Sequence, residues 1–461
     1  MTDPTDLTVQ QAATALAAGD LTSRALTEAY LDRIAARDGD INAYITVTAE
    51  TALAQADVSD ARTERLGPLD GVPIALKDNI DVAGVATTNG MGPRNRPVPE
   101  TDAPVVARLR AAGAVVLGKL NMHEGALGAT TDNEHHGRTQ NPWRRGVTPG
   151  GSSGGSGAAV AARLCAAALG TDTMGSVRLP AAYCGVAGLK PTFGLVSTRG
   201  VAALSWRLDH VGPLCRSVAD LGLMLDGMAG HDPDSIESVM APDDGSYAAD
   251  APHNLAGVRV GVIANFDTVE ISDDILHGFQ AALAQLESMG AREQRLTLPD
   301  YDPSAARRAG LLVSEAEAAV FHESDLADHP AAFSDAFRSM LAYGRDVRGD
   351  RLIKAERTVQ HAGFALRRAF EAVDVIAAPT TPQTAFPFEQ PAPANQADLT
   401  APANFAGCPA VSVPCGVSAS GLPIGLQLIA PPFSERYLLG LAMAFEAACG
   451  YHLPPLPAEG F

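Results

Sequence analysis

The chain has 461 residues, of which 46% are hydrophobic and 19% are charged, and this composition is ordinary for a globular protein with a large core. Its formal net charge of −19 argues against direct binding of nucleic acid, because such binding needs Lys and Arg to neutralise phosphates. The same charge disfavours anionic membranes, and no apolar run is long enough to span a bilayer.

The predicted elements alternate between helices and strands along the chain. Residues 8–35 predict two helices, the first with a capping box of Thr8 and Gln11 and an end at Gly19. A buried strand at 72–76 delivers Lys77 at its C-terminal end. Beyond it, the pattern predicts helices at 104–112 and 158–169, a helix capped by Ser272 that runs through Leu286, a mainly helical region at 304–371 and a closing helix at 434–449, with strands at 114–118, 258–264, 373–378 and 422–430. This alternation indicates an α/β architecture with a partly parallel sheet.

The most informative stretch is the Gly/Ser-rich run at 149–157, PGGSSGGSG. A phosphate-binding loop is disfavoured, because the run does not end in Gly-Lys-Ser/Thr. A nucleophile elbow with Ser153 is also disfavoured, because turn-like residues precede it where that motif needs a strand. A flexible linker remains an alternative for the run alone, but a second Gly-Ser turn follows at 170–184.

Three separated segments together resemble the amidase signature family. They place Lys77 in G-x-P-x-x-x-K-D, Ser152 in G-G-S-S-G-G and Ser176 in D-T-x-G-S-x-R-x-P, with the two serines 24 positions apart. Further matching segments lie at 184–197, 208–213 and 401–428.

The resemblance implies one domain over residues 1–461, with a large mixed central β-sheet flanked on both sides by helices. Its core motifs fall at about 65–220 and 370–450. The resemblance is weakest at about 265–395, where we expect a mainly helical, substrate-side region that sets specificity. The Pro-rich connection at 379–402 suits an ordered loop beside the pocket better than a linker.

The resemblance implies a hydrolase that forms an acyl-enzyme on Ser176. A serine hydroxyl is a poor nucleophile until a base takes its proton, and here Lys77 would be that base and Ser152, after a cis peptide bond, the relay. A neutral lysine is required, and burial away from carboxylates lowers the pKa of a lysine by disfavouring the ammonium. Asp78 adjoins Lys77, but neighbours on an extended chain point to opposite faces, so it need not oppose this effect.

The resemblance also implies an oxyanion hole made by the backbone N–H groups of Thr173, Met174, Gly175 and Ser176. The family usually has Gly at position 174, so the Met174 side chain is expected to restrict the backbone and crowd the mouth of the site.

Around this turn, Ser153 would support the site by hydrogen bonding, and Asp172 and Arg178 would brace the loop. An ordinary surface pair is the alternative for those two charges. The acyl pocket would be lined by Leu127, Gly128, Ala129, Thr130 and Trp206, although core packing explains each of them equally well.

No metal or cofactor is expected. His123-Glu124 and His135-His136 are the candidates for a metal site, but HEGAL is not H-E-x-x-H and adjacent histidines face apart. The six cysteines contain no C-x-x-C pair, and the first residues lack a signal peptide, so we expect a cytoplasmic protein.

Three hypotheses follow for the activity. The first is a free-standing hydrolase of a carboxylic amide, or of a carbamate or urea-like bond, acting on a small molecule, with a homodimer as one allowed state. The second is the A subunit of the glutamine-dependent tRNA amidotransferase. The stretch NMHEG around His123 and an offset of Asp398 favour the first. An inactive scaffold is disfavoured, because Lys77, Ser152 and Ser176 are all present.

Overall fold

One mixed sheet organises the molecule. The computed structural model describes residues 3–93, 97–242, 245–248, 254–451 and 453, so both ends of the expected 1–461 domain lie outside the described residues. Within these ranges, eleven strands form the order β1-β3-β2-β4-β6-β5-β10-β11-β9-β7-β8. The strands are β1 (Tyr44–Val47), β2 (Pro73–Lys77), β3 (Val115–Leu120), β4 (Ala167–Thr171), β5 (Ala187–Lys190), β6 (Val211–Cys215), β7 (Arg259–Ile263), β8 (Arg292–Leu296), β9 (Val375–Pro379), β10 (Ala410–Val417) and β11 (Pro423–Ile429).

Parallel and antiparallel pairings occupy different parts of this sheet. Strand β2 runs parallel to β3 and β4, and β7 runs parallel to β8 and β9. Between these two groups, the pairs β4–β6, β6–β5, β5–β10, β10–β11 and β11–β9 are antiparallel. The expected partly parallel sheet is therefore confirmed.

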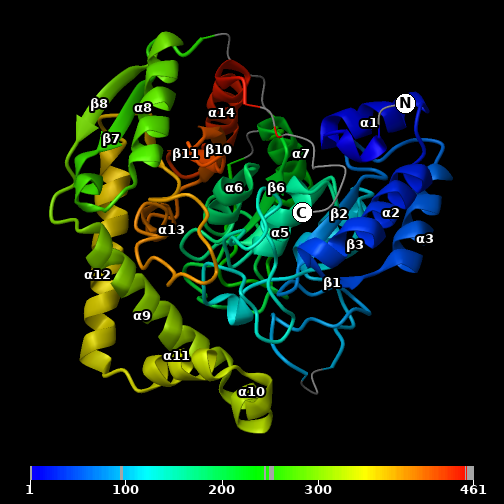
Figure 1. The fold of residues 1–461 in the computed structure, drawn as a ribbon, viewed down its shortest axis with the longest axis horizontal. Helices are drawn as coiled ribbons and strands as arrows, with labels where there is room; N and C mark the ends of the chain where they lie inside the picture. The colour runs from blue at the N-terminus through cyan, green and yellow to red at the C-terminus, as the bar shows by residue number, and fades with distance from the viewer. Residues whose placement is uncertain (1–2, 94–96, 243–244, 249–253, 452, 454–461) are drawn as a thin grey trace.

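Helices cover the sheet on both faces, as Figure 1 shows. Helices α1 to α3 lie beside strands β1 to β3, while α9, α11 and α10 extend away from the sheet. No helix of the described residues is long and apolar enough to cross a membrane. The helices are α1 (Val9–Ala18), α2 (Ser23–Ile41), α3 (Ala49–Asp60), α4 (Pro104–Ala111), α5 (Gly154–Ala161), α6 (Arg178–Cys184), α7 (Val218–Met228), α8 (Asp273–Ser288), α9 (Pro303–Phe321), α10 (Glu323–Asp328), α11 (Asp335–Arg345), α12 (Gly349–Ala369), α13 (Ala401–Phe405) and α14 (Glu435–Cys449), with short 3-10 turns at Pro4–Asp6, Glu124–Ala126, Ala264–Thr268 and Pro330–Ala332.

The first predicted helix is confirmed down to its ends. The Thr8 side chain accepts from the Gln11 N–H, the Gln11 side chain accepts from the Thr8 N–H, and Gly19 ends the helix in the left-handed conformation. Ser272 does precede α8 with the backbone of a capping residue, but its side chain makes no capping hydrogen bond. Ser272 is therefore confirmed as the residue at the N-cap, without a side-chain hydrogen bond.

The single helix predicted at 158–169 is wrong. Helix α5 begins at Gly154 and ends at Ala161, and strand β4 follows at Ala167. Glycine has a low helix propensity, so a glycine run does not predict the start of a helix. Close packing of α5 nevertheless requires glycine there. A Cβ on Gly155 would lie 2.3 Å from the Asn121 carbonyl oxygen, so only glycine allows α5 to pack this closely. Residues 167–171 form a strand because they hydrogen-bond to β2 on one side and to β6 on the other.

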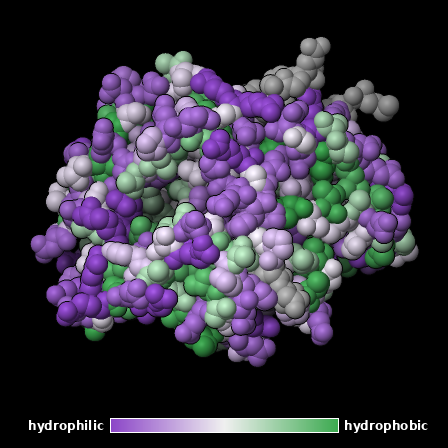
Figure 2. Space-filling model, turned by 60° about the horizontal axis from the view of Figure 1, so that its bottom comes forward, coloured by the Kyte–Doolittle hydropathy of each residue, from purple (hydrophilic) through white to green (hydrophobic). Residues whose placement is uncertain are grey.

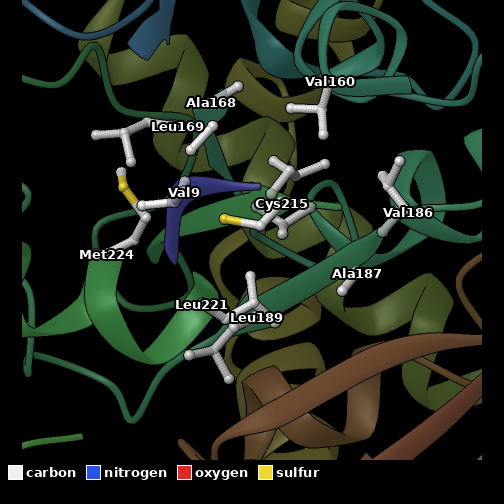
Figure 3. Close-up of a cluster of buried hydrophobic side chains, with 14 of the residues drawn as sticks. Val9, Val160, Ala168, Leu169, Val186, Ala187, Leu189, Cys215, Leu221 and Met224 are labelled. Atoms are coloured by element: carbon white, nitrogen blue, oxygen red, sulfur yellow. The ribbon is translucent and has the colours of Figure 1, made fainter. Parts of the chain in front are cut away.

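The main hydrophobic core lies where the sheet meets these helices. Figure 3 shows part of it, with Val160 of α5, Leu189 of β5, Cys215 of β6 and Met224 of α7 gathered in one cluster. All four side chains are fully buried. A second cluster packs α9, α12 and α13 against β9, which attaches the helical region to the same sheet.

The surface of the molecule is largely polar. The face in Figure 2 is mostly hydrophilic, and hydrophobic residues appear in scattered patches among the polar ones. Exposed apolar side chains are normal on such a surface.

Candidate active site

Lys77 ends strand β2 inside the protein. Its side chain is fully buried, and its Nζ lies 2.7 Å from Ser152 Oγ and 2.7 Å from Thr171 Oγ1. Burial lowers the pKa of Lys77 to about 7, although the carboxylates of Asp209 and Asp172 oppose this shift. A substantial share of this lysine is therefore neutral near pH 7, as a general base requires.

Asp78, the neighbour of Lys77, forms an ion pair with a different lysine, Lys119. Its Oδ1 lies 3.0 Å from Lys119 Nζ, and both side chains are fully buried. Its other oxygen accepts from the backbone N–H and the hydroxyl of Thr88. These contacts agree with the expectation that Asp78 does not oppose the neutral state of Lys77.

The Gly/Ser-rich run brings Ser152 to this lysine. The peptide bond between Gly151 and Ser152 is cis, as the family resemblance implies. The Ser152 carbonyl accepts from the His123 N–H at 3.0 Å. The next residue, Ser153, donates from its hydroxyl to the Thr171 carbonyl at 3.1 Å and accepts from the Thr171 N–H at 3.2 Å. Ser153 thus fixes the run to the end of β4, which matches its expected supporting contacts.

Asp172 and Arg178 form a buried pair behind the second Gly-Ser turn. Both side chains are fully buried, and Arg178 Nε and Nη2 donate to the two Asp172 oxygens at 3.0 and 2.9 Å. Burial alone would raise the pKa of Asp172, but the Arg178 guanidinium and an Asn404 hydrogen bond hold it well below its usual value. The alternative of an ordinary surface pair is wrong.

One predicted member of the oxyanion hole is already engaged. The Gly175 N–H donates to Asp172 Oδ1 at 2.7 Å, so it is not available to a substrate oxygen. Its assignment to the oxyanion hole is corrected on this basis. Gly175 instead shapes the turn, because its φ of +137° favours glycine and an added Cβ would lie 2.4 Å from Thr400 Oγ1.

Three backbone N–H groups of the turn remain available. In the described part of the chain, those of Thr173, Met174 and Ser176 have no protein acceptor. The Ser176 side chain is partly exposed, and its hydroxyl makes no hydrogen bond within the same residues. Its carbonyl accepts from the Ser153 N–H at 3.3 Å, which joins the two serine segments. The link between Ser176 and Ser152 stays a prediction.

Met174 directs its side chain toward the helical region. Its carbonyl accepts from Thr400 Oγ1 at 2.6 Å, and its sulfur lies close to Gly310 of α9 and the Phe405 ring of α13. The backbone of Met174 does not have a positive φ, so this residue fits without left-handed strain. Met174 therefore packs against α9, and the expected crowding of the mouth of the site stays a prediction.

The predicted pocket residues differ in placement. Leu127 is buried in a third hydrophobic cluster, where the core-packing interpretation holds. Gly128, Ala129 and Thr130 are half-buried, and a Cβ on Gly151 would lie 2.7 Å from the Thr130 nitrogen, so their loop adjoins the cis peptide. Trp206 is 40% exposed, and its ring packs edge-to-face against the ring of Phe321 in α9.

Several site residues were not found from the sequence. Thr171 bonds Lys77 Nζ, and Asn79 in turn donates to Thr171 Oγ1 at 3.1 Å. Asp209 accepts from Thr173 Oγ1 at 2.6 Å. Asn404 donates to Asp172 at 2.9 Å across 232 residues of chain. The position of Thr171 directly before Asp172 was a usable signal, whereas the long-range partners required the fold.

The histidines considered as metal ligands have other contacts. His135 Nε2 lies 3.4 Å from Glu124 Oε1, while His136 contacts Thr88 and the Met91 carbonyl. Among the described residues, no group of three or more potential metal ligands comes together.

Comparison with known proteins places this geometry in a family. The Amidase family model matches residues 25–439. The A subunit of glutamyl-tRNA(Gln) amidotransferase from Chromohalobacter salexigens is 38% identical over 480 residues, which cover 97% of this chain and 98% of that protein. The corresponding protein of Moorella thermoacetica is 40% identical, with 97% of each chain covered.

Solved structures give the same result. One, described as "An unexpected vestigial protein complex reveals the evolutionary origins of an s-triazine catabolic enzyme", has a TM-score of 0.91 and 36% identity over 98% of this chain and 100% of that one. A 6-aminohexanoate cyclic dimer hydrolase has a TM-score of 0.88 and 29% identity over 99% of both chains. The chain therefore belongs to the amidase signature family of enzymes, which act on carbon–nitrogen bonds.

Proposed function

We propose that the protein hydrolyses a carbon–nitrogen acyl bond through an acyl-enzyme on Ser176. The observation that carries this proposal is the buried Lys77, whose Nζ is 2.7 Å from Ser152 Oγ and whose pKa burial lowers to about 7. A lysine in this state accepts a proton at neutral pH, and the serine beside it can pass one on.

In the proposed reaction, acylation is the first half. Ser176 Oγ attacks the acyl carbon while its proton passes through the Ser152 hydroxyl to Lys77. The C–N bond then breaks, and the departing amine takes the proton back by the same route. In the second half, water attacks the ester on Ser176, and the relay again moves the proton, so that the acid is released and Ser176 is restored.

The negative charge on the substrate oxygen needs donors in this scheme. The unengaged N–H groups of Thr173, Met174 and Ser176 are the candidates. Asp172 holds the turn through Gly175 and Val177, which keeps these groups in fixed directions. One such donor contributes about 3 kcal/mol to the transition state.

The comparisons favour the amidotransferase over the free-standing amidase that the sequence favoured. The relatives from Chromohalobacter and Moorella carry that name and match over nearly their whole length. The offset of Asp398 in the sequence speaks against this candidate, but the buried Asp398 binds the partly exposed Arg307 and Ser304 of α9, which puts opposite charges side by side. A glutamine there would place its ammonium on Asp398 and its carboxylate on Arg307.

A free-standing amidase is the second candidate. It is supported by Met174, whose side chain packs against α9 beside the turn, and by the similarity to the 6-aminohexanoate cyclic dimer hydrolase. Such an enzyme would act on a small amide, or on a carbamate or urea-like bond, without a partner protein.

One experiment separates the two candidates. The purified chain is assayed for ammonia release from glutamine and for turnover of small aryl and alkyl amides and carbamates, alone and with the other subunits of a glutamyl-tRNA(Gln) amidotransferase. Glutaminase activity that requires those subunits supports the first candidate, and turnover of amides by the chain alone supports the second. No turnover under any condition, with Ser176→Ala as the matched control, contradicts both.

A further inference from the structure

Asp209 connects Lys77 with the turn at 172–176, here named the oxyanion turn after its proposed donors, although neither the motifs nor the proposed reaction assigns Asp209 a function. It precedes β6, which pairs antiparallel with β4 so that Val211 faces Thr171, the residue that binds Lys77 Nζ. From there its Oδ1 accepts from Thr173 Oγ1 at 2.6 Å. Its Oδ2 accepts from the N–H groups of Leu204 and Ser205 at 2.8 and 3.1 Å.

This carboxylate differs from the other two near Lys77. Asp172 is paired with Arg178 and Asp78 with Lys119, so each has its own cation. Within the described residues, Asp209 has neutral donors and no salt-bridge partner, and its side chain is buried. Of the two carboxylates that favour the charged form of Lys77, it has the larger effect.

The pKa of Asp209 depends on its own surroundings, including Lys77. Burial raises the pKa of Asp209 to about 6, while the Thr173 hydroxyl, the two N–H groups and the charge of Lys77 lower it. Asp209 is therefore largely ionised at neutral pH. Its negative charge is present when Lys77 takes up a proton.

We propose that Asp209 is a positioning residue that holds Thr173 in the oxyanion turn and stabilises the ammonium that forms on Lys77 during acylation. This inference rests on the proposed function of Lys77 as the base. The side chain acts through Thr173 and Lys77 and does not itself touch the substrate.

Asp209 lines a cavity of about 290 Å³ together with other charged residues, Arg199, Asp234 and Glu237. Arg199 is committed to Asp232 and Asp234, with its Nε 2.9 Å from Asp232 Oδ2, so it does not pair with Asp209. The two acidic residues of the lining add no cation.

The next residue in the chain, His210, is not among the residues that line this cavity. Its Nδ1 lies 2.7 Å from the Leu208 carbonyl and 3.2 Å from the Asp172 carbonyl. Burial holds the pKa of His210 well below its usual value, so this ring is neutral at the pH of the proposed reaction. Among the described residues, Lys77 is thus the cation that responds to Asp209.

The test follows the reaction of Ser176 with a fluorophosphonate, which needs no knowledge of the natural substrate. The serine oxygen bonds to phosphorus, fluoride leaves, and the proton passes to the relay. The labelling rate is measured against pH for the wild type and for Asp209→Asn, with Asp234→Asn as the matched control in the same cavity. Circular dichroism and the thermal midpoint check that each variant is folded.

We expect two changes in Asp209→Asn. The plateau rate falls about tenfold or more, because Thr173 and the ammonium on Lys77 lose their support. The pH at which the labelling rate falls on the acid side decreases by about one unit or more, because Lys77 without the neighbouring negative charge stays neutral at lower pH. Asp234→Asn keeps the wild-type profile. An Asp209→Asn profile equal to the wild type, or an acid-side fall at higher pH than in the wild type, overturns the inference.

Thr173 variants decide the question if Asp209→Asn does not fold. Thr173→Val, which cannot donate to Asp209, should lower the plateau rate, and Thr173→Ser, which keeps the hydroxyl, should restore it. Equal rates in both variants overturn the inference. A Ser176→Ala protein that still labels at the wild-type rate would instead contradict the proposed function, so the two failures are distinguishable.

Discussion

The sulfur of Met174 lies against Gly310, close enough that a Cβ on that glycine would be 2.9 Å from it. The same added atom would lie 2.6 Å from the Phe405 ring. Met174 belongs to the oxyanion turn and Gly310 to α9, so this contact connects the proposed chemistry to the helical region where the family resemblance is weakest. The absence of a side chain at Gly310 is what allows Met174 to pack there.

Gly310→Ala should therefore lower kcat/KM by several fold, because the new methyl group displaces Met174 and Phe405 and overpacking costs about 1–3 kcal/mol. Adding Met174→Gly should recover part of the loss by removing one of the two clashes. Steady-state kinetics on the amide that the wild type turns over measures both effects. Gly349→Ala is the control, because a Cβ there meets nothing within 4 Å. Equal losses in the single and double variants would contradict the proposed contact.

Lys77→Ala should reduce amide turnover by a factor of about 100 or more, which is the usual contribution of a general base. Activated esters should lose less, because their leaving groups need no proton. The ratio of the two losses, measured by initial rates, is the readout. Lys354→Ala serves as the control, since that lysine is exposed. A variant with undiminished amidase activity would show that another group is the base.

The rate should also depend on the protonation of Lys77. Below its pKa of about 7 the lysine carries a proton and cannot accept another, so kcat/KM should fall about tenfold for each pH unit on the acid side. A profile between about pH 5 and about pH 9 measures this limb. Burial lowers the pKa of the nearby His123 to about 4, so this histidine does not account for a limb near 7. A profile that stays flat on the acid side would exclude Lys77 as the base.

Arg178→Met should destabilise the fold by about 3–5 kcal/mol, because it leaves the Asp172 carboxylate buried without its cation. Urea unfolding at neutral pH measures the change in the free energy of unfolding. Arg348→Met, which removes an exposed arginine paired with Asp350, should leave the midpoint unchanged. If both variants unfolded at the wild-type midpoint, the buried pair would not stabilise the turn.

The sequence was sufficient for the parts of the site that lie in continuous motifs. Lys77 at the end of its strand, the cis peptide before Ser152 and the first capped helix all appear as expected. The helix predicted at 158–169 failed because the pairing of β4 within the sheet overrides local propensity. Short buried strands such as β5 and β6 carry no clear period by which they could have been found.

Long-range contacts account for what the sequence could not show. Gly175 could not be excluded from the oxyanion hole until the Asp172 side chain was seen to accept its N–H. Asp209 is separated from Thr173 by 36 residues, and no local pattern joins them. The direction of the Met174 side chain likewise depends on the packing of Gly310.

The identity of the residue that carries the acyl group decides whether Ser176 is the nucleophile. The protein is mixed with p-nitrophenyl acetate, quenched in acid and digested, and the acetylated peptide is identified by mass spectrometry. Ser153→Ala and Ser176→Ala are analysed in parallel, because Ser153 is the nucleophile of the alternative elbow motif. We expect acetylation of Ser176 in the wild type and in Ser153→Ala, and its loss in Ser176→Ala. Acetylation of Ser153, or an acetylated Ser176→Ala protein, would show that Ser176 is not the nucleophile.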